Sequence, residues 1–208
     1  YIQWGQRQVT KARQKTLAGI AWPKVPSVSG RRQWYTIDNI GAADVICNRF
    51  FDRRFFFGFC DFPVIEDQTF YGLILDPKYK ARKLAQIALL NSTSSYLFIE
   101  VLGRVGLGLG VLQYARVDME RLLALDILSF DQPLVERLLR AFDTLSARPI
   151  LPIFDETNRN DRRDLDSIVF EALGIAPEQV DHLYESLLFL IRERLSKADS
   201  LSNVRRVE

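Results

Sequence analysis

The spacing of apolar residues changes near Lys78, and this change limits the chain to a mixed architecture. Before it, short runs rich in aromatic residues are separated by glycine, proline and polar residues, which is typical of strands. After it, apolar residues recur at helical spacing. We therefore predict an α+β fold, with an aromatic-rich mixed β first half with packed helices, followed by an all-helical C-terminal part. The predicted strands are Gln33–Ile37, Asp44–Cys47, Phe55–Phe59 and Thr69–Leu75.

The predicted helices have recognisable start and stop residues. Ser92 or Thr93 can cap a helix that ends at Gly103, Asp118 and Asp131 can each cap another, and Gly174 can end a further helix. The last helix carries apolar residues at offsets 0, 3, 4, 7, 8, 11 and 15 from Val180. This stripe either packs against its own domain or docks a partner. Besides the helix before Gly103, we predict helices at Tyr79–Leu90, Met119–Leu125, from Asp131 to Leu145, Arg163–Leu173 and Glu178–Lys197.

A cluster of glycines follows the helix that ends at Gly103. A phosphate-binding loop would need a strand before the glycines, a helix after them and a Lys-Ser or Lys-Thr ending. Here the order is inverted, and Leu107 and Leu109 stand among the glycines. A small-ligand enzyme built on this cluster is therefore disfavoured, and a tight turn before a strand at Val111–Arg116 is favoured. The cluster is Gly103, Gly106, Gly108 and Gly110.

Charge is distributed unevenly along the chain. The first 58 residues contain ten basic and three acidic residues, a net charge of +7, whereas residues 59–208 sum to −5. Such a split suggests one half that faces a polyanion, although chance clustering on a surface is the alternative. Residues 1–30 have no lasting period and are predicted to form an extended arm or a long loop. Its Lys11, Arg13 and Lys15 alternate, so in an extended chain they would point to one side.

Several kinds of chemistry are disfavoured by the sequence. Cys47 and Cys60 are too few for a zinc site and sit in apolar surroundings, so we expect free thiols in a reducing, cytoplasmic compartment, with a disulfide as the alternative. His182 lies on the flank of an amphipathic helix, which disfavours a catalytic role. Charged residues interrupt every long apolar run, so no membrane span is expected. The acidic residues at 155–166 alternate with arginines, which indicates a salt-bridged helix start rather than a metal site.

Short motifs occur in a consistent order along residues 1–128. They are Tyr1-Ile2-x-Trp4-Gly5, Arg32-x-Trp34-Tyr35, Phe70-Tyr71-Gly72-Leu73-Ile74, Leu90-Asn91-Ser92, Gly103-Arg104 with the glycine cluster, Leu112-Gln113, and Asp118-Met119-Glu120-Arg121-Leu122 with Asp126-Ile127. In this order they resemble the target-recognition region of N-6 adenine DNA methyltransferases from bacterial restriction–modification systems. Residues 155–198 resemble the tail that often follows that region.

The resemblance implies a DNA target-recognition domain at residues 1–128 and a helical C-terminal subdomain at 129–208. The family transfers a methyl group from S-adenosylmethionine to adenine, but its Pro-Pro catalytic tetrapeptide and its cofactor-binding glycine motif have no counterpart here. The chain starts without Met, so we expect it to be cut from a longer protein. We then expect no catalytic residue, cofactor or metal in this chain, with the cofactor bound in an upstream methyltransferase domain.

The expected partners are double-stranded DNA and that upstream domain. Arginine can pair with guanine edges and glutamine with adenine edges, and basic residues can contact phosphates. The aromatic run Phe55–Phe59 is expected to form core packing, with a stacking surface for unpaired bases as the alternative. The alternative function is a helical protein-docking module. The predicted DNA-binding residues are Lys11, Arg13, Lys15, Arg31, Arg32, Arg53, Arg54, Arg104 and Gln113.

Overall fold

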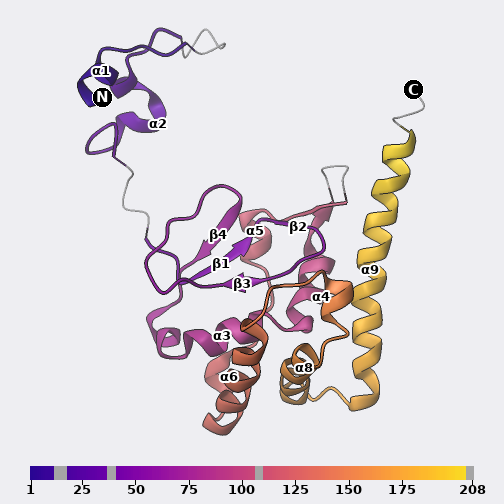
Figure 1. Cartoon of the computed structure of the whole chain (residues 1–208). Helices are drawn as coiled ribbons and strands as arrows, with labels where there is room; N and C mark the ends of the chain where they lie inside the picture. The colour runs from indigo at the N-terminus through magenta and orange to yellow at the C-terminus, as the bar shows by residue number, and fades with distance from the viewer. Residues whose placement is uncertain (12–17, 37–40, 106–109, 205–208) are drawn as a thin grey trace. The chain divides into compact units, whose positions relative to one another are not determined.

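The computed structural model describes residues 1–11, 18–36, 41–105 and 110–204 (Figure 1). The chain divides into two compact units, which we call the N-terminal unit (residues 1–41) and the main unit (residues 42–208). Each unit is described by itself.

The N-terminal unit consists of short helical turns around one buried glycine. Its elements are α1 (Ile2–Gln6), the 3₁₀ turn η1 (Trp22–Lys24) and α2 (Pro26–Ser29). The indole of Trp34 lies over Gly5, where a Cβ atom would come within 2.5 Å of the ring atom Cη2. The Trp-Gly motif and the Trp-Tyr motif of the sequence therefore meet in one contact.

Two predictions for this unit are wrong. The extended arm at residues 1–30 instead folds back on itself, because Val9 forms an antiparallel bridge with Ala21 and helical turns lie on both sides. The strand predicted at Gln33–Ile37 is a turn over residues 33–36, in which the Thr36 N–H donates to the carbonyl of Gln33 at 3.0 Å. Alternating apolar residues were too few here to hold a strand without a pairing partner.

Among the described residues of the main unit, the strands form two antiparallel sheets. The first has the order β3–β1–β4 and the second the order β2–β6–β5. Cys47 in the first sheet lies opposite both Phe57 and Tyr71. The strand bounds are β1 (Val45–Asn48), β2 (Phe50–Phe51), β3 (Phe57–Gly58), β4 (Phe70–Leu73), β5 (Arg104–Val105) and β6 (Leu112–Gln113). Strands are thus confirmed within the three predicted runs from Asp44 to Leu75, although the ladders are shorter than the apolar runs.

The other elements of the main unit are helices, which confirms the α+β class and the helical C-terminal part. Ser92 and Asp131 cap α4 and α6 as predicted, and Gly174, with φ of 68°, follows α8. Figure 1 shows β3, β1 and β4 above α3, with α6 beside α3. The bounds are η2 (Pro77–Arg82), α3 (Lys83–Leu90), α4 (Thr93–Leu102), α5 (Arg116–Met119), η3 (Ile127–Ser129), α6 (Gln132–Ser146), α7 (Ile153–Glu156), α8 (Asn160–Ala172) and α9 (Pro177–Val204).

One predicted cap is wrong. Asp118 does not begin the predicted helix Met119–Leu125, because α5 starts earlier, at Arg116, and ends at Met119, so residues 120–125 are not helical. The Asp118 carboxylate accepts a hydrogen bond from the N–H of Ala115, the residue before α5, at 2.9 Å. Asp118 therefore stabilises the start of α5 from a position within its first turn. Aspartate is favoured both at a cap and in the first turn, and the sequence pattern did not separate the two positions.

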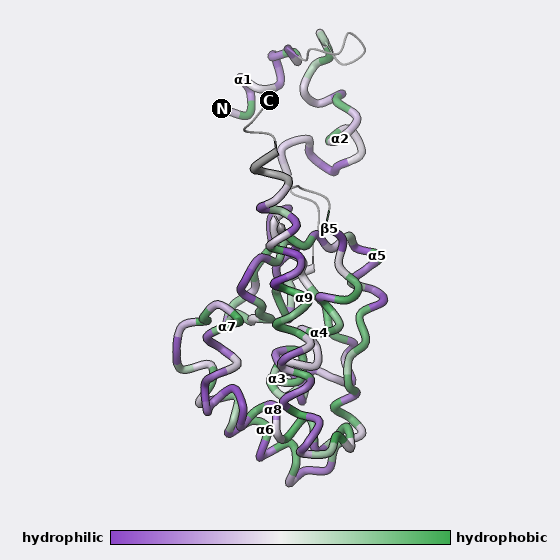
Figure 2. The backbone as a smooth tube through the Cα atoms, turned by 90° about the vertical axis from the view of Figure 1, so that its right-hand side faces the viewer, coloured by the Kyte–Doolittle hydropathy of each residue, from purple (hydrophilic) through white to green (hydrophobic). Residues whose placement is uncertain are grey.

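The apolar stripe of α9 is buried within its own chain. Leu187 and Ile191 are fully buried, and α9 packs along α4 (Figure 1). Figure 2 shows hydrophobic stretches of α3, α4 and α9 gathered in the middle of the main unit. Helices on both sides of residue 128 share this core, since α3 packs on α6 and α4 on α8. The domain boundary between 128 and 129 stays a prediction, and many contacts cross it.

A buried ion pair joins α9 to the second sheet. Arg194 Nε donates to Glu100 Oε1 of α4 at 2.8 Å, and both side chains are 3% exposed. The Nη2 group of Arg194 donates to the carbonyl of Asp52 at 2.7 Å, and Nη1 donates to the carbonyl of Gly110. Burial raises the pKa of Glu100, and the hydrogen bond from Arg194 opposes that shift. The Arg194 guanidinium therefore connects α9 to α4, to the residue after β2 and to the segment just before β6.

The packing of Gly103 predicts a stability change. A Cβ atom there would lie 2.1 Å from Cδ2 of Leu112 and 3.0 Å from Cε2 of Tyr114, both of which are buried. Gly103→Ala should therefore lower the free energy of unfolding by about 1–3 kcal/mol, as overpacking does, measured by urea denaturation. Gly58→Ala is the matched control, because its Cβ would meet its nearest neighbour at 3.7 Å. Equal unfolding midpoints for the two variants would contradict the close packing of Gly103.

Candidate nucleic-acid interface

A row of three side chains, with Arg104 exposed and Phe50 and Gln113 half-buried, crosses the second sheet on the side away from the core. In the antiparallel ladders, Gln113 of β6 lies opposite Phe50 of β2 on one side and Arg104 of β5 on the other. Residues directly opposite each other project from the same face of a sheet. The three side chains therefore stand side by side, and we call them the exposed row. The predicted DNA-binding residues Arg104 and Gln113 are both members of it.

The other face of this sheet is anchored in the core. Phe51 and Leu112 are paired across β2 and β6, and both are almost completely buried. Since successive residues of a strand point to opposite faces, burying Phe51 and Leu112 turns Phe50 and Gln113 outward. The outward direction of the exposed row thus follows from the packing of its neighbours.

Asp118 holds the guanidinium of Arg104. The Nη2 group donates to Oδ1 of Asp118 at 2.6 Å, while Oδ2 accepts the N–H of Ala115. The Arg104 side chain is 61% exposed and that of Asp118 is 7% exposed. The hydrogen bond from Ala115 and then the contact with Arg104 hold the pKa of Asp118 below its usual value, so the carboxylate is charged at neutral pH. Arg104 is oriented from one side, and its Nε and Nη1 have no contact partner among the described residues.

Arg49 extends this basic face towards the first sheet. Its guanidinium carbon lies 5.6 Å from the ring centre of Phe50 and 5.9 Å from that of Tyr71. Stacking on two rings restrains the side chain without neutralising its charge. Arg49 was not predicted as a site residue, although its position next to Phe50 in the chain was visible in the sequence.

Two glycines of the cluster have structural roles. Gly103 lets the end of α4 meet Leu112 and Tyr114, as described above. Gly110 has φ of 69°, and a Cβ atom there would lie 3.1 Å from Ala198 Cβ and 3.2 Å from Leu195 Cδ2 on α9. It therefore combines a left-handed turn with a close approach to α9. Gly106 and Gly108 lie outside the described residues.

The other predicted DNA-binding residues are not in the exposed row. Lys11, Arg31 and Arg32 belong to the N-terminal unit, where Arg31 Nη1 donates to the carbonyl of Thr36 at 2.8 Å. Arg13 and Lys15 lie outside the described residues.

Arg53 and Arg54 are exposed in the segment between β2 and β3. The carbonyl of Arg53 accepts the N–H of Ile153 at 2.7 Å, and Arg54 Nε donates to the carbonyl of Ile150 at 3.3 Å. Both residues thus help to hold residues 150–153 against the strand segment. The structure brings Arg104 and Gln113 together and places Arg53 and Arg54 on this neighbouring segment.

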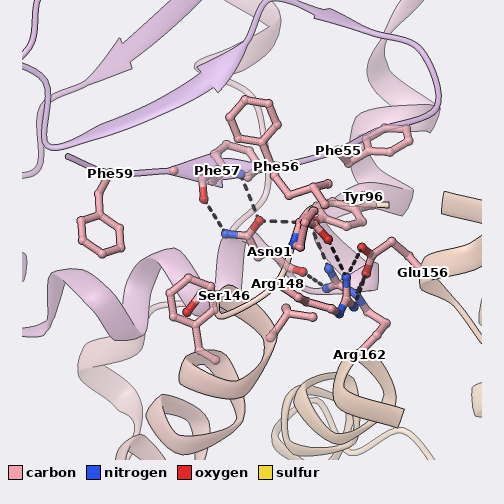
Figure 3. A pocket seen from close by; sticks show the side chains of 15 residues that line it. Phe55, Phe56, Phe57, Phe59, Asn91, Tyr96, Ser146, Arg148, Glu156 and Arg162 are labelled. Atoms are coloured by element: carbon pink, nitrogen blue, oxygen red, sulfur yellow. Dashed lines mark hydrogen bonds and ion pairs between the residues drawn. The ribbon is translucent and has the colours of Figure 1, made fainter. Parts of the chain in front are cut away.

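A pocket of about 330 Å³ lies between β3 and the segment that follows α6 (Figure 3). Its walls are mostly phenylalanine side chains from residues 55–59, together with Phe142 and Leu145. Its polar groups come from Asn91, Tyr96, Arg148, Glu156 and Arg162.

These polar groups already bind one another. Asn91 Oδ1 accepts the N–H of Phe57 at 3.0 Å, and its Nδ2 donates to the carbonyl of Phe57 at 2.7 Å. Arg148 donates five hydrogen bonds, as many as a guanidinium has N–H groups. Its acceptors are Glu156, Asp161 and the carbonyl of Pro149. The network in Figure 3 therefore ties the walls of the pocket together and offers a ligand few open hydrogen-bonding groups.

The predicted salt-bridged cluster around residues 155–166 is confirmed. Burial raises the pKa of Glu156, but hydrogen bonds from Arg148 and Leu151 outweigh it, so the pKa lies below its usual value. The hydrogen bond from Arg148 likewise lowers the pKa of Asp161. Asp166 is fully buried and accepts hydrogen bonds from Thr93 and from Tyr184 at 2.8 Å.

Cys47 and Cys60 are free thiols, so the alternative of a disulfide is excluded in this structure. Burial raises the pKa of Cys47 to about 12, which keeps it a neutral thiol. His182 is exposed on α9, with Nδ1 3.5 Å from Glu185. Neither cysteine nor histidine therefore sits in an arrangement typical of nucleophilic catalysis.

Comparison of the chain with known protein families, with curated proteins and with solved structures gives no match. Within the described ranges, no helix combines the length and the apolar composition that a membrane span needs. The same residues contain no group of three or more His, Cys, Asp or Glu side chains placed to hold a metal ion.

The network around Arg148 predicts an acid-sensitive stability difference. Arg148→Met leaves Glu156, 4% exposed, without its bidentate partner, so the free energy of unfolding at pH 7 should fall by about 3–5 kcal/mol. Glu156 and Asp161, the two carboxylates that Arg148 binds, both have lowered pKa values in the folded state. Their contribution to the free energy of unfolding is therefore present above the ordinary carboxyl pKa of about 4 and is lost as the pH falls below it. Urea denaturation at pH 7 and pH 3.5 should show the difference between wild type and variant shrinking in acid.

Arg137→Met is the matched control for this measurement. It also removes a two-bond arginine–carboxylate pair, with Glu171, but both side chains are exposed. Its effect should be far smaller because water solvates both charges. A difference for Arg148→Met that stays constant with pH would show that the pair with Glu156 and Asp161 is not what stabilises this region.

Proposed function

We propose that this chain is the DNA target-recognition module of an S-adenosylmethionine-dependent adenine DNA methyltransferase from a restriction–modification system. The ordered motifs of residues 1–128 and the basic first part of the chain support the proposal. In it, methyl transfer and cofactor binding belong to an upstream domain of the same protein, and this chain supplies contacts to double-stranded DNA.

The observation that carries the proposal is the exposed row. Arginine reads guanine through O6 and N7, and glutamine reads adenine through N6 and N7, each with two hydrogen bonds. Side chains opposite each other in an antiparallel pair are about 5 Å apart at Cβ, so Arg104 and Gln113 can reach neighbouring base pairs. The major groove, about 12 Å wide, admits a two-stranded β-ribbon such as β5–β6.

Asp118 adds a reason to assign the reading role to Arg104. A long arginine side chain loses conformational entropy when it is fixed on a base, and this cost reduces affinity. The hydrogen bond to Asp118 fixes part of the side chain before DNA arrives. Nη2 has a second hydrogen, and Nε and Nη1 remain, so a two-bond contact with guanine stays possible.

The alternative function, a helical docking module, would need a surface other than the stripe of α9. Leu187 and Ile191, the apolar residues at its centre, are fully buried against the core of the main unit. The exposed row, by contrast, offers hydrogen-bonding groups in a fixed arrangement, which is what sequence reading requires.

Substitutions in the exposed row should change sequence preference. We expect the full chain to select preferred sequences from a pool of random duplexes at low salt. Arg104→Ala and Gln113→Ala should each reduce the preference for the selected sequence over a scrambled one by about 1–3 kcal/mol, because each removes a base-edge contact. Binding curves for the selected and scrambled duplexes measure this ratio.

Arg116→Ala is the matched control, since Arg116 is an exposed arginine on α5 that pairs with Glu120 by an i,i+4 contact. It should weaken both duplexes alike. If the wild-type chain selects no sequence, or if the Arg104 and Gln113 variants keep the wild-type preference, the proposal fails.

A further inference from the structure

Large aromatic side chains are exposed throughout the N-terminal unit. Tyr1 is 98% exposed, Trp4 58%, Trp22 42% and Tyr35 42%. The chain has three tryptophans, Trp4, Trp22 and Trp34, and all of them lie in this unit of 41 residues. Scattered exposed leucines need no explanation, but tryptophan and tyrosine concentrated on one small unit indicate a contact surface.

The same unit is strongly basic. Its 41 residues contain seven basic residues and one acidic residue, Asp38, which gives a net charge of +6. A surface of this charge attracts a polyanion. Its basic residues in the described ranges are Arg7, Lys11, Lys24, Arg31 and Arg32.

A polar pocket of about 370 Å³ opens among these groups. Gln6, Ser29, Arg32 and Gln33 line it together with the indole of Trp34. The Nε1 atom of that indole is buried and has no hydrogen-bond partner among the described residues. Gln6, Arg32 and Gln33 bring side-chain N–H donors to this lining, which suits a ligand with many acceptor oxygens.

We infer that the N-terminal unit binds unpaired nucleotides of a DNA strand, by stacking bases on its exposed rings and placing phosphates against its basic side chains. Aromatic rings with interspersed cations are the combination that binds single strands without a fixed sequence. In a duplex the faces of the bases are already stacked on one another, so exposed rings gain little there. The inference goes beyond duplex reading by the exposed row, and its choice of a DNA strand rests on the proposed function.

Tryptophan fluorescence of the full chain tests this inference directly. Because all three tryptophans lie in the N-terminal unit, the signal reports on that unit alone. We expect a 15-nucleotide oligo-dT to quench the fluorescence in a saturable way. An oligomer of the same length made of abasic nucleotides carries the same phosphates without bases, and it should bind more weakly and quench little.

Variants then identify the rings. Trp4→Ala and Trp22→Ala should each weaken oligo-dT binding about tenfold, within the range for one stacked base, while Trp4→Phe should keep most of the affinity. Phe189→Ala is the matched control, because Phe189 is 59% exposed but lies on α9 of the main unit, and it should have no effect. Circular dichroism of each variant checks that the fold is kept.

Several results would overturn the inference. They are the absence of quenching by oligo-dT, equal binding and quenching by the abasic oligomer, and unchanged affinity in both tryptophan variants. Tighter binding of oligo-U than of oligo-dT would overturn the assignment to DNA. The exposed row is tested separately: Arg104→Ala should leave oligo-dT quenching unchanged, and Trp4→Ala should leave the sequence preference for duplexes unchanged.

Discussion

The buried pair of Arg194 and Glu100 is the contact on which the exposed row depends. Strands of two residues, such as β2 and β6, have too few ladder hydrogen bonds to be stable by themselves. Arg194 donates hydrogen bonds to the carbonyls of Asp52 and Gly110. Asp52 directly follows β2, and Gly110 lies two residues before β6. Removing one partner of such a pair leaves a charge buried without compensation, which typically costs about 3–5 kcal/mol. The second sheet is thus positioned by a side chain of α9, far away in the sequence.

A second buried arginine, Arg162, also joins distant segments of the main unit. Arg162 on α8 donates to the carbonyl of Asn91 and pairs with Glu156 at 3.3 Å. Asn91 in turn holds both backbone groups of Phe57 in β3. The Leu-Asn-Ser motif is therefore structural in this chain, because its Asn joins β3 to α3 and its Ser caps α4. The polar groups of these residues are satisfied inside the fold.

Local chemistry explains which elements could be predicted. Caps such as Ser92 and Asp131, and the left-handed Gly174, act within one turn of a helix, so their neighbours in the sequence reveal them. In the second sheet, the predicted strand Val111–Arg116 contains β6, whereas β2 and β5 were not predicted, since these two-residue strands depend on the packing of Phe51 and Leu112 in the core. Within the candidate site, Arg104 and Gln113 were named from motif order. Their position opposite each other, and the contact of Arg104 with a carboxylate 14 residues away, depend on tertiary structure.

The two units carry side chains suited to different surfaces of a nucleic acid. In the exposed row, Arg104 and Gln113 project from one face of a sheet, and their hydrogen-bonding groups are of the kinds that match base edges, which a duplex displays in its grooves. The N-terminal unit has exposed rings, which match base faces, and a duplex displays those only where it is opened. The edges of the bases differ between base pairs and so carry sequence information, whereas the faces of the bases carry almost none. Taken together, the two proposals assign the selection of a site to base edges and the binding of a strand with unstacked bases to base faces.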